Sequence, residues 1–397
     1  MCAKAAFLIS VVSLLVLVCS LPALAATRTW ENEAGDNRWD NAVNWSKDKI
    51  PGATDIARIV LAGADECLID AAVDASVKKL QVGYNDGTTA FSGDLRMTGG
   101  SLFFKNASPV GPKAEGRFYL EGGTVTANNV PSFGDGLGGI GYLFMSGGVF
   151  NVGSAETKRA LRIGDDGGKG YATISDGLVN AYGNLVIGRE AADGPEGLVG
   201  SEGLLSLLGG IINVGSEASA SDLSIGKQYA TGALEISGGR INLIGDLKVG
   251  ETTIKIIDDP YEEIIRPGTG FLKMTRGILS VADSNNIKIG ADLGIGHVDL
   301  WGGTLLGGNL EIGEPGSGGS LDVRGGTLIL EGNQMANVLG YIGDGRMTAY
   351  GGWSGAEWQY DFNVRNEGKT TVTAIPEPAT LLLLGLGGMA LLRRRRA

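Results

Sequence analysis

A phrase of two short apolar strands around a Gly-Gly step recurs along the chain and limits the folds open to it. In the copy GALEISGGRINL, which begins at Gly232, apolar residues alternate with polar ones on both sides of Gly238-Gly239. An apolar period of two lets each strand bury one face. The glycines permit backbone angles that a side chain forbids, so the chain can turn a corner there. Ten copies occur, and they begin at Gly93, Gly116, Gly141, Gly170, Gly203, Gly232, Gly270, Gly296, Gly319 and, in degenerate form, Gly345.

A second, shorter phrase stands between most copies and reads as a third strand closed by glycine, as in LRIG at Leu161 and LKVG at Leu247. Three strands per unit describe one rung of a solenoid, because one rung cannot bury its apolar face whereas a stack of rungs can. A β-propeller or a β-prism is the alternative, but a propeller blade needs about 40 residues or more. We therefore expect a solenoid over residues 76–360.

The repeat resembles the parallel β-helix of autotransporter-like bacterial surface proteins and of pectate-lyase-like, polysaccharide-degrading enzymes. The resemblance implies an all-β fold, a single-stranded right-handed parallel β-helix of about ten rungs. An N-terminal signal helix and a C-terminal hydrophobic helix would flank it.

Residues 1–25 have the organisation of a secretory signal peptide. Lys4 gives a positive start, residues 7–18 are apolar, and Ala23-Leu24-Ala25 is an A-x-A site that predicts cleavage between Ala25 and Ala26. The sequence therefore predicts export.

Residues 26–75 are expected to form a Trp-rich cap and the first strands. Trp30, Trp39 and Trp45 fall within 16 residues. The indoles could form a sugar-stacking patch. We favour a cap over the open end of the first rung, because an exposed strand edge invites association.

Charge and composition exclude several classes of function. The chain has 44 acidic and 33 basic residues, a formal net charge of −11, so it repels nucleic acid and we expect no nucleic-acid partner. Cys67 is the one cysteine outside the leader, which excludes an intramolecular disulfide. His297 is the single histidine, which excludes a two-histidine metal site and most histidine-paired nucleophiles.

Acids recur beside glycines at corners of the repeat, at 85–87, 134–136, 164–167 and 343–345. Asp165 and Asp166, the adjacent pair, are the candidates for a catalytic carboxylate pair. Stacked carboxylates would otherwise suit Ca²⁺; beyond that the sequence predicts no cofactor and no metal. We favour a third interpretation, that Asp-Gly is ordinary turn chemistry. Binding groups would be sought in the longest loops, 189–202, 215–222 and 251–269.

The C-terminal segment has a different character. Residues 361–375 lack the repeat and are expected to form a last strand and a linker. Pro376-Glu377-Pro378 is followed by an apolar run, 379–392, and then by arginines. The run is shorter than the roughly 20 residues of a stable membrane span, which indicates a transient anchor. The arginines would hold its end in the cytoplasm.

Residues 376–397 resemble the PEP-CTERM sorting signal of Gram-negative bacteria. The likeness rests on the tripeptide Pro376, Glu377 and Pro378, on the glycine-interrupted apolar run, and on Arg393, Arg394, Arg395 and Arg396. It implies recognition by an exosortase, a membrane cysteine transpeptidase, and removal of the tail near the tripeptide. It further implies export and association with exopolysaccharide or biofilm.

The sequence thus favours an exported, non-enzymatic β-helix protein that acts as a structural or adhesive component of the cell surface or extracellular matrix. The alternative is a β-helix polysaccharide lyase or glycoside hydrolase that uses paired carboxylates.

Overall fold

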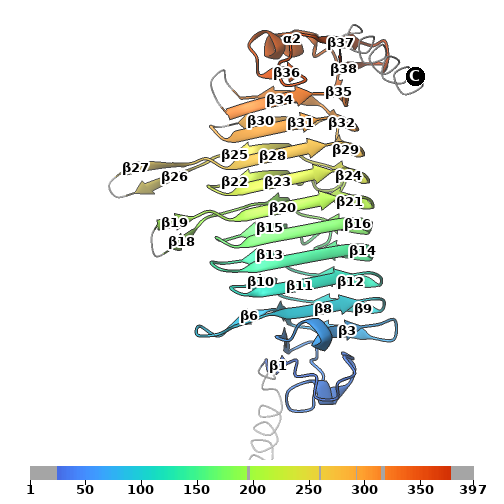
Figure 1. Ribbon diagram of the computed structural model, residues 1–397, viewed down its shortest axis with the longest axis vertical. Helices are drawn as coiled ribbons and strands as arrows, with labels where there is room; N and C mark the ends of the chain where they lie inside the picture. Colours follow the sequence, from blue (N-terminus) through green and yellow to red (C-terminus); the bar gives the residue numbers. More distant parts are fainter. Residues whose placement is uncertain (1–24, 195–196, 259–260, 292, 314–317, 377–397) are drawn as a thin grey trace, which may run out of the picture.

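The chain winds into a tall stack of parallel rungs (Figure 1). The structure is a computed structural model and describes residues 25–194, 197–258, 261–291, 293–313 and 318–376. It has about eleven rungs, and the predicted all-β parallel solenoid is confirmed. Its right-handedness stays a prediction. The expected signal helix and the C-terminal hydrophobic helix lie outside the described residues.

Each rung contributes a strand to each of three faces. The short phrase forms one sheet, whose strands are β1 (Thr27–Thr29), β2 (Ile56–Ile59), β5 (Lys79–Val82), β10 (Ser108–Pro112), β13 (Pro131–Asp135), β15 (Leu161–Asp165), β17 (Leu185–Ile187), β22 (Leu223–Lys227), β25 (Leu247–Glu251), β30 (Asn286–Ala291) and β33 (Asn309–Ile312).

The first half of the long phrase forms the second face, with β3 (Cys67–Ile69), β8 (Gly93–Met97), β11 (Glu115–Leu120), β14 (Ile140–Val152), β16 (Lys169–Ala181), β20 (Glu202–Leu207), β23 (Thr231–Ile236), β28 (Thr269–Met274), β31 (Ile295–Leu300), β34 (Gly318–Val323) and β36 (Met347–Ala349). β14 and β16 continue into the third face.

The second half forms that third face, with β4 (Asp74–Val77), β9 (Ser101–Phe104), β12 (Thr124–Ala127), β21 (Ile211–Val214), β24 (Arg240–Leu243), β29 (Ile278–Val281), β32 (Thr304–Gly307) and β35 (Thr327–Glu331). The copies stack in the register in which they align: Gly203 lies over Gly232, and Gly232 over Gly270.

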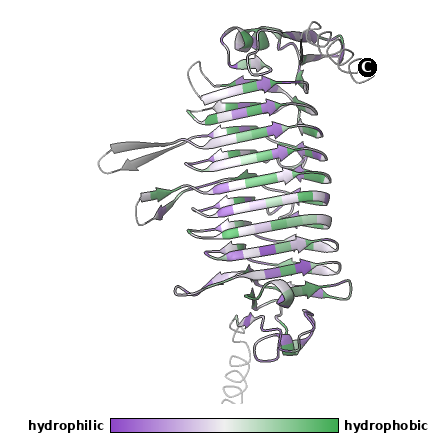
Figure 2. Cartoon of the chain, viewed as in Figure 1, coloured by the Kyte–Doolittle hydropathy of each residue, from purple (hydrophilic) through white to green (hydrophobic). Residues whose placement is uncertain are grey.

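Alternate residues of every strand fill the interior of the coil. Leu234 and Ile236 of β23, with Ile241 and Leu243 of β24, are buried in one continuous core, and green and purple segments alternate along the strands in Figure 2. The corner glycine Gly239 has φ +67°, and an ideal Cβ there would lie 2.6 Å from the carbonyl oxygen of Gly210 in the rung before. Glycine is therefore required both by the corner and by its neighbouring rung.

Three antiparallel hairpins leave the stack between rungs. They are β6 (Tyr84–Asn85) with β7 (Ala90–Phe91), β18 (Ala192–Gly194) with β19 (Gly197–Val199), and β26 (Thr253–Asp258) with β27 (Tyr261–Arg266). The second and third occupy the predicted loops 189–202 and 251–269, and they project from the same side of the rod (Figure 1). The third predicted loop, 215–222, contains a single bridge between Ser216 and Ser219.

The N-terminal segment closes the first rung. It contains the short 3₁₀ turns η1 (Ala42–Asn44) and η2 (Gly63–Asp65). Trp39 donates its backbone N–H to Leu68 of β3, and Leu68 donates to Asn37. The segment thus occupies backbone groups of β3, the first strand of its face. Trp30, Trp39 and Trp45 are buried and pack edge to face, so their rings are not available to stack on a sugar.

The C-terminal end departs from the repeat. A short helix, α2 (Met335–Gly343), precedes β36, and β37 (Ala356–Phe362) and β38 (Lys369–Pro376) follow it. β38 runs antiparallel to both β35 and β37. Within 361–375, residues 370–373 pair with β35 on one side and with β37 on the other. A strand is therefore present in this stretch, and its division into a last strand and a linker stays a prediction.

Candidate functional site

Asp165 and Asp166, the predicted carboxylate pair, do not face a common site. Asp165 is 3% exposed, at the end of β15, whereas Asp166 is exposed and takes a left-handed turn conformation with φ +50°. Arg162 Nη1 lies 2.9 Å from the Asp165 carboxylate, and Arg189 Nη1 lies 3.0 Å from it. The carboxylate of Asp165 is thus already neutralised by two guanidinium groups from its own rung and the next.

The neighbour that Asp165 does have is Asp135. The two residues are register partners on β15 and β13. Burial raises the pKa of Asp135, and the nearby charges of Asp165 and Asp166 raise it further, against a hydrogen bond with Ser132 that lowers it. Asp135 is therefore more readily protonated than an ordinary aspartate, and Asp165 is paired with arginines, an arrangement that sequence spacing did not indicate.

The acids of the predicted corners at 85–87 and 343–345 lie away from this pair. Asp86 lies in the loop of the β6–β7 hairpin, where its carboxylate accepts hydrogen bonds from Thr88 and Thr89. Asp344 caps the end of α2 and pairs with Arg346. Among the described residues, no three His, Cys, Asp or Glu side chains converge to hold a metal ion.

Cys67 and His297 also have structural surroundings. Cys67 is fully buried, and burial raises the pKa of its thiol well above the usual value, so it is a poor nucleophile. His297 is exposed on β31, stacks on Phe271 with ring centroids 5.6 Å apart, and has Nδ1 2.7 Å from Ser320 Oγ.

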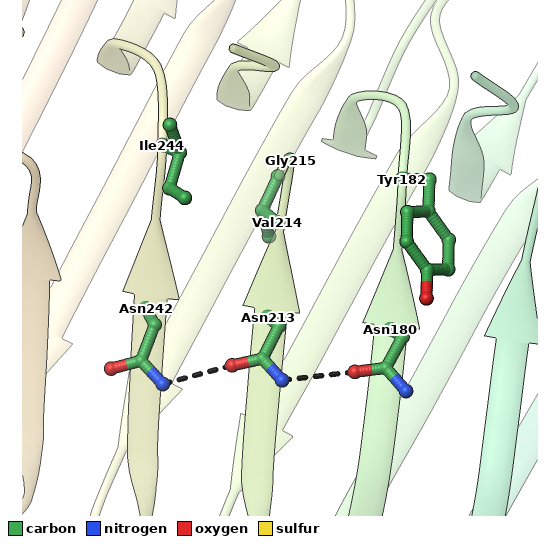
Figure 3. A pocket seen from close by; sticks show the side chains of 7 residues that line it. All are labelled: Asn180, Tyr182, Asn213, Val214, Gly215, Asn242 and Ile244. Atoms are coloured by element: carbon green, nitrogen blue, oxygen red, sulfur yellow. Dashed lines mark hydrogen bonds between the residues drawn. The ribbon is translucent and has the colours of Figure 1, made fainter. Parts of the chain in front are cut away.

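A row of asparagines crosses the third face and lines a groove. Asn151, Asn180, Asn213 and Asn242 occupy the same position in successive copies. The side-chain Nδ2 of each of the last three donates a hydrogen bond of 2.8–2.9 Å to the side-chain Oδ1 of the asparagine in the rung before. Figure 3 shows three of them in line beside Tyr182. The groove has a volume of about 250 Å³. Each amide keeps a second N–H and a free lone pair that can bond a hydroxyl group.

The asparagine row was missed at the sequence level although its signal was present, because Asn recurs one residue before the end of the copies VFNV, LVNA, IINV and RINL. In a parallel, in-register stack, residues at the same position of each copy lie one above the next, so these asparagines form a row.

Stacked aromatic rings join neighbouring rungs on the second face. Tyr119 and Phe144 stack with centroids 5.1 Å apart, and Tyr142 and Tyr171 with centroids 5.2 Å apart. The guanidinium of Arg96 lies 4.5 Å from the centroid of Tyr119. These ring–ring and cation–π contacts stabilise one rung against the next.

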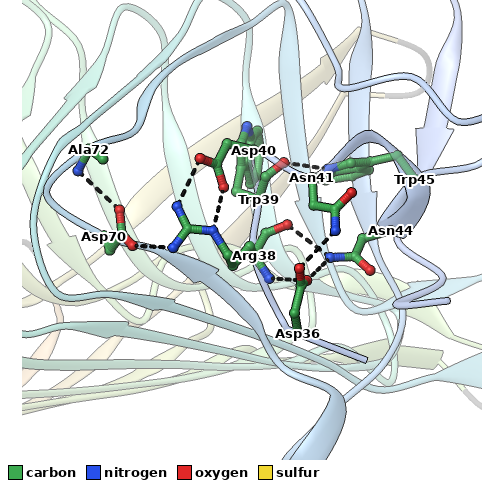
Figure 4. A network of polar contacts seen from close by, with 9 residues as sticks. All are labelled: Asp36, Arg38, Trp39, Asp40, Asn41, Asn44, Trp45, Asp70 and Ala72. Atoms are coloured by element: carbon green, nitrogen blue, oxygen red, sulfur yellow. Dashed lines mark hydrogen bonds and ion pairs between the residues drawn. The ribbon is translucent and has the colours of Figure 1, made fainter. Parts of the chain in front are cut away.

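The polar network of the N-terminal cap ties it to the first rung (Figure 4). Arg38 pairs with Asp40 at 2.9 Å and with Asp70, which follows β3, at 3.1 Å. The buried amide of Asn44 donates to Asp36 and to the backbone of Arg38. Hydrogen bonds from Asn41 and Asn44 lower the pKa of Asp36, so this carboxylate stays charged in moderately acidic solution.

At the predicted signal cleavage site, Ala25 is exposed and the backbone N of Ala26 lies 3.3 Å from Asp55 Oδ1. Asp55 is buried and also faces Arg28 Nε at 3.8 Å. The residue predicted to begin the processed chain is therefore already held by a carboxylate.

The sorting residues begin where the described structure ends. Pro376 is the last residue of β38 and pairs with Ala356; Glu377, Pro378 and Arg393–Arg396 lie outside the described residues. Within the part that is described, no helix has the length and apolar character to cross a membrane.

Comparison with known proteins bears on this segment alone. No curated protein and no solved structure matched the chain. Residues 374–396 match the model of the PEP-CTERM protein-sorting motif. The chain is thus a β-solenoid that carries a PEP-CTERM sorting signal, which implies recognition by an exosortase and export by way of the membrane to the cell surface.

Proposed function

We propose that the protein is an exported structural or adhesive rod of the cell surface or extracellular matrix, held transiently at the inner membrane by its tail before exosortase processing. The observation that carries this proposal is the junction of the two parts. The sorting-motif match begins at Ala374, inside the last strand of the solenoid, so the signal acts directly on the rod.

The polar side chains of the rod support a role without catalysis. Asp165 is paired with two arginines, and on the same face Asp222 and Asp246 bond the backbone of the following rung while pairing at 2.8 Å with Lys248 and Lys288. These groups are engaged in joining rung to rung. A hydrolase or lyase would instead need two acids free to reach a substrate.

The groove lined by the asparagine row is where we place the proposed adhesive contact. A row of amides beside the ring of Tyr182 offers hydrogen bonds and an apolar edge, which is the chemistry that neutral sugar hydroxyls and ring faces require. We assign exopolysaccharide contact to this groove. Loss of retention on a neutral polysaccharide column in Asn213→Ala, with retention kept in the remote control Asn309→Ala, would support the assignment; unchanged retention would contradict it.

Cell fractionation tests the proposed function. The protein should reach the cell surface or the medium with its tail removed, and a variant with Arg393–Arg396 replaced by serine should stay unprocessed in the inner membrane or be lost. Replacing Arg240 and Arg276, two exposed arginines of the rod, by serine is the control and should change nothing. Equal processing and location in both variants would contradict the proposal.

A further inference from the structure

The C-terminal end of the rod exposes more large apolar side chains than the N-terminal end, where Val43 and Ile50 are the exposed ones among the described residues. At the N-terminal end Trp45 is 0% exposed, whereas at the C-terminal end Trp353 is 44% and Val364 is 79% exposed. We call residues 335–376, which hold α2 and β36–β38, the terminal layer. Its exposed large apolar side chains are Leu339, Trp353, Tyr360, Phe362 and Val364.

The exposed aromatics of β37 continue the core face of the rod. Tyr360 pairs with Val372 and Phe362 with Thr370, and both partners on β38 are 0% exposed. Directly opposed residues of antiparallel strands share a face, so Tyr360 and Phe362 lie on the side that the inner rungs bury. Within the described residues β37 pairs with β38 alone, and no further strand covers it.

The chain that leaves this layer is apolar almost at once. Pro376 ends β38, and the apolar run begins at Ala379. Three Cα–Cα steps reach at most about 11 Å. The polar layer on each side of a bilayer is about 5–8 Å thick. If the run starts at the hydrocarbon boundary, the end of β38 lies inside the headgroup layer or at most about 3–6 Å beyond it, which brings the terminal layer to the membrane surface.

We propose that the terminal layer is a membrane-contact surface, which rests its exposed aromatic and aliphatic side chains in the headgroup region while the tail is inserted. The inference rests on the proposed function, because it requires the tail in the membrane. Trp and Tyr are the side chains that favour this region, since each combines an apolar ring with a polar group. The rod then stands with its N-terminal cap away from the membrane.

Charge indicates how the contact is made. Over β37, β38 and the turn between them, Glu357, Asp361 and Glu367 outnumber Arg365 and Lys369, and Arg365 and Lys369 are paired with acids. Attraction to anionic lipid is therefore not the source of binding. The contact should form on zwitterionic phosphatidylcholine and persist at high salt, as apolar insertion does.

A lipid-quenching experiment on the predicted processed chain, which starts at Ala26 and keeps the C-terminal tail, tests the inference. Cys2 and Cys19 are removed with the leader, and Cys67 is fully buried. Val364→Cys then carries a nitrobenzoxadiazole label in the terminal layer, and Val43→Cys, whose valine is 44% exposed at the other end, is the matched control. Each protein is reconstituted in phosphatidylcholine vesicles with and without a headgroup nitroxide, and circular dichroism checks the fold.

We expect the label at 364 to emit at shorter wavelength and to lose most of its fluorescence to the nitroxide at low and at high salt, and the label at 43 to do neither. Val364→Asp should reduce quenching of a label at Leu339→Cys, as a second measurement on the same surface. Equal behaviour of the labels at 364 and 43 would overturn the inference, because the end would then be held away from lipid.

Two other outcomes are distinct from these. A blue shift without quenching would mean that protein, either a second copy or the chain's own tail, covers the surface, and would overturn the inference. Failure of the unlabelled chain to float with vesicles would instead contradict the proposed anchoring by the tail and would remove the inference with it.

Discussion

Asp135 and Asp165 are register partners on neighbouring rungs, so two carboxyl groups lie one above the other on the same face of the coil. Arg162 and Arg189 pair with Asp165, and burial together with the charge of Asp165 raises the pKa of Asp135. The effect of substituting Asp165 and the pH response of Asp135 both follow from this arrangement.

The raised pKa of Asp135 predicts a pH-dependent stability. The folded chain holds this proton more tightly than the unfolded chain, whose pKa is near 3.8. Its stabilising contribution is complete below that value and is lost as pH rises through the folded pKa. Asp135→Asn should therefore raise the free energy of unfolding by about 1 kcal/mol at pH 7 and change it less at pH 4. Thermal unfolding at both pH values checks this, and an equal effect at both would contradict it.

Asp165→Asn should destabilise the rod by about 2 kcal/mol, because it removes charge-assisted hydrogen bonds to two arginines around a buried group. The adjacent, exposed Asp166→Asn is the control and should stay within about 0.5 kcal/mol of the parent. Urea denaturation measures both. If Asp165→Asn leaves stability unchanged but abolishes activity on a polysaccharide, the enzyme alternative would replace the structural reading.

The asparagine row predicts a position-dependent cost. Asn213 shares two amide hydrogen bonds of the row, whereas Asn151 accepts one. At about 1 kcal/mol for each bond, Asn213→Ala should cost about 2 kcal/mol and Asn151→Ala about 1 kcal/mol. Chemical denaturation of the two variants and of the double variant gives these numbers. Equal costs would show that the bonds of the row do not determine its stability.

Alanine substitutions at three glycines distinguish the cost of backbone strain from the cost of a steric clash. Gly239 has φ +67° and a crowded Cβ position, Gly35 has φ +66° with no atom within 4 Å, and Gly340 in α2 has neither constraint. Alanine should cost more than about 2 kcal/mol at Gly239, cost about 1–2 kcal/mol at Gly35, and stabilise by about 0.5–1 kcal/mol at Gly340. Melting temperatures give the order; a tolerated Gly239→Ala would argue against the close rung packing.

The site before Ala26 predicts a link between processing and stability. Cleavage there would convert the Ala26 nitrogen, 3.3 Å from Asp55 Oδ1, into an ammonium group, and a charge-assisted bond is stronger than a neutral one. A chain that starts at Ala26 should be about 1 kcal/mol more stable than its N-acetylated form. The difference should vanish in Asp55→Asn. If the stability difference between the free and acetylated chains persists in Asp55→Asn, it does not come from the bond between Ala26 and Asp55.

The repeat made the rungs predictable, and the ends were not. Gly232 and its equivalents stack as the aligned copies indicate, because residues at the same position of each copy become register partners in a parallel sheet, whatever the length of the loop between copies. Helix α2 carries no such signal: it has nine residues, and its N-cap Gln334 makes no side-chain hydrogen bond. The degenerate phrase at Gly345 keeps the register of the copies in its first half, where Met347 of β36 pairs with Leu321 of β34, and departs from the repeat after it.

Contacts between rungs were also beyond the sequence. Asp165 and Arg189 are 24 residues apart, and their pairing depends on the length of the chain between β15 and β17. Adjacent acids at a corner can also differ in burial, as the buried Asp165 and the exposed Asp166 do; a catalytic role for this pair stays a prediction.

The reversed direction of β38 has a consequence for how such a molecule evolves. Because β38 runs antiparallel to β35, a further rung cannot pair with it in the parallel pattern of the stack, and β37 and β38 end the solenoid. The tryptophan cluster ends it at the opposite side. Duplication or deletion of a unit between them would leave both ends intact. Selection can then change the length of the rod by one repeat unit at a time, while the C-terminal sorting signal stays unchanged.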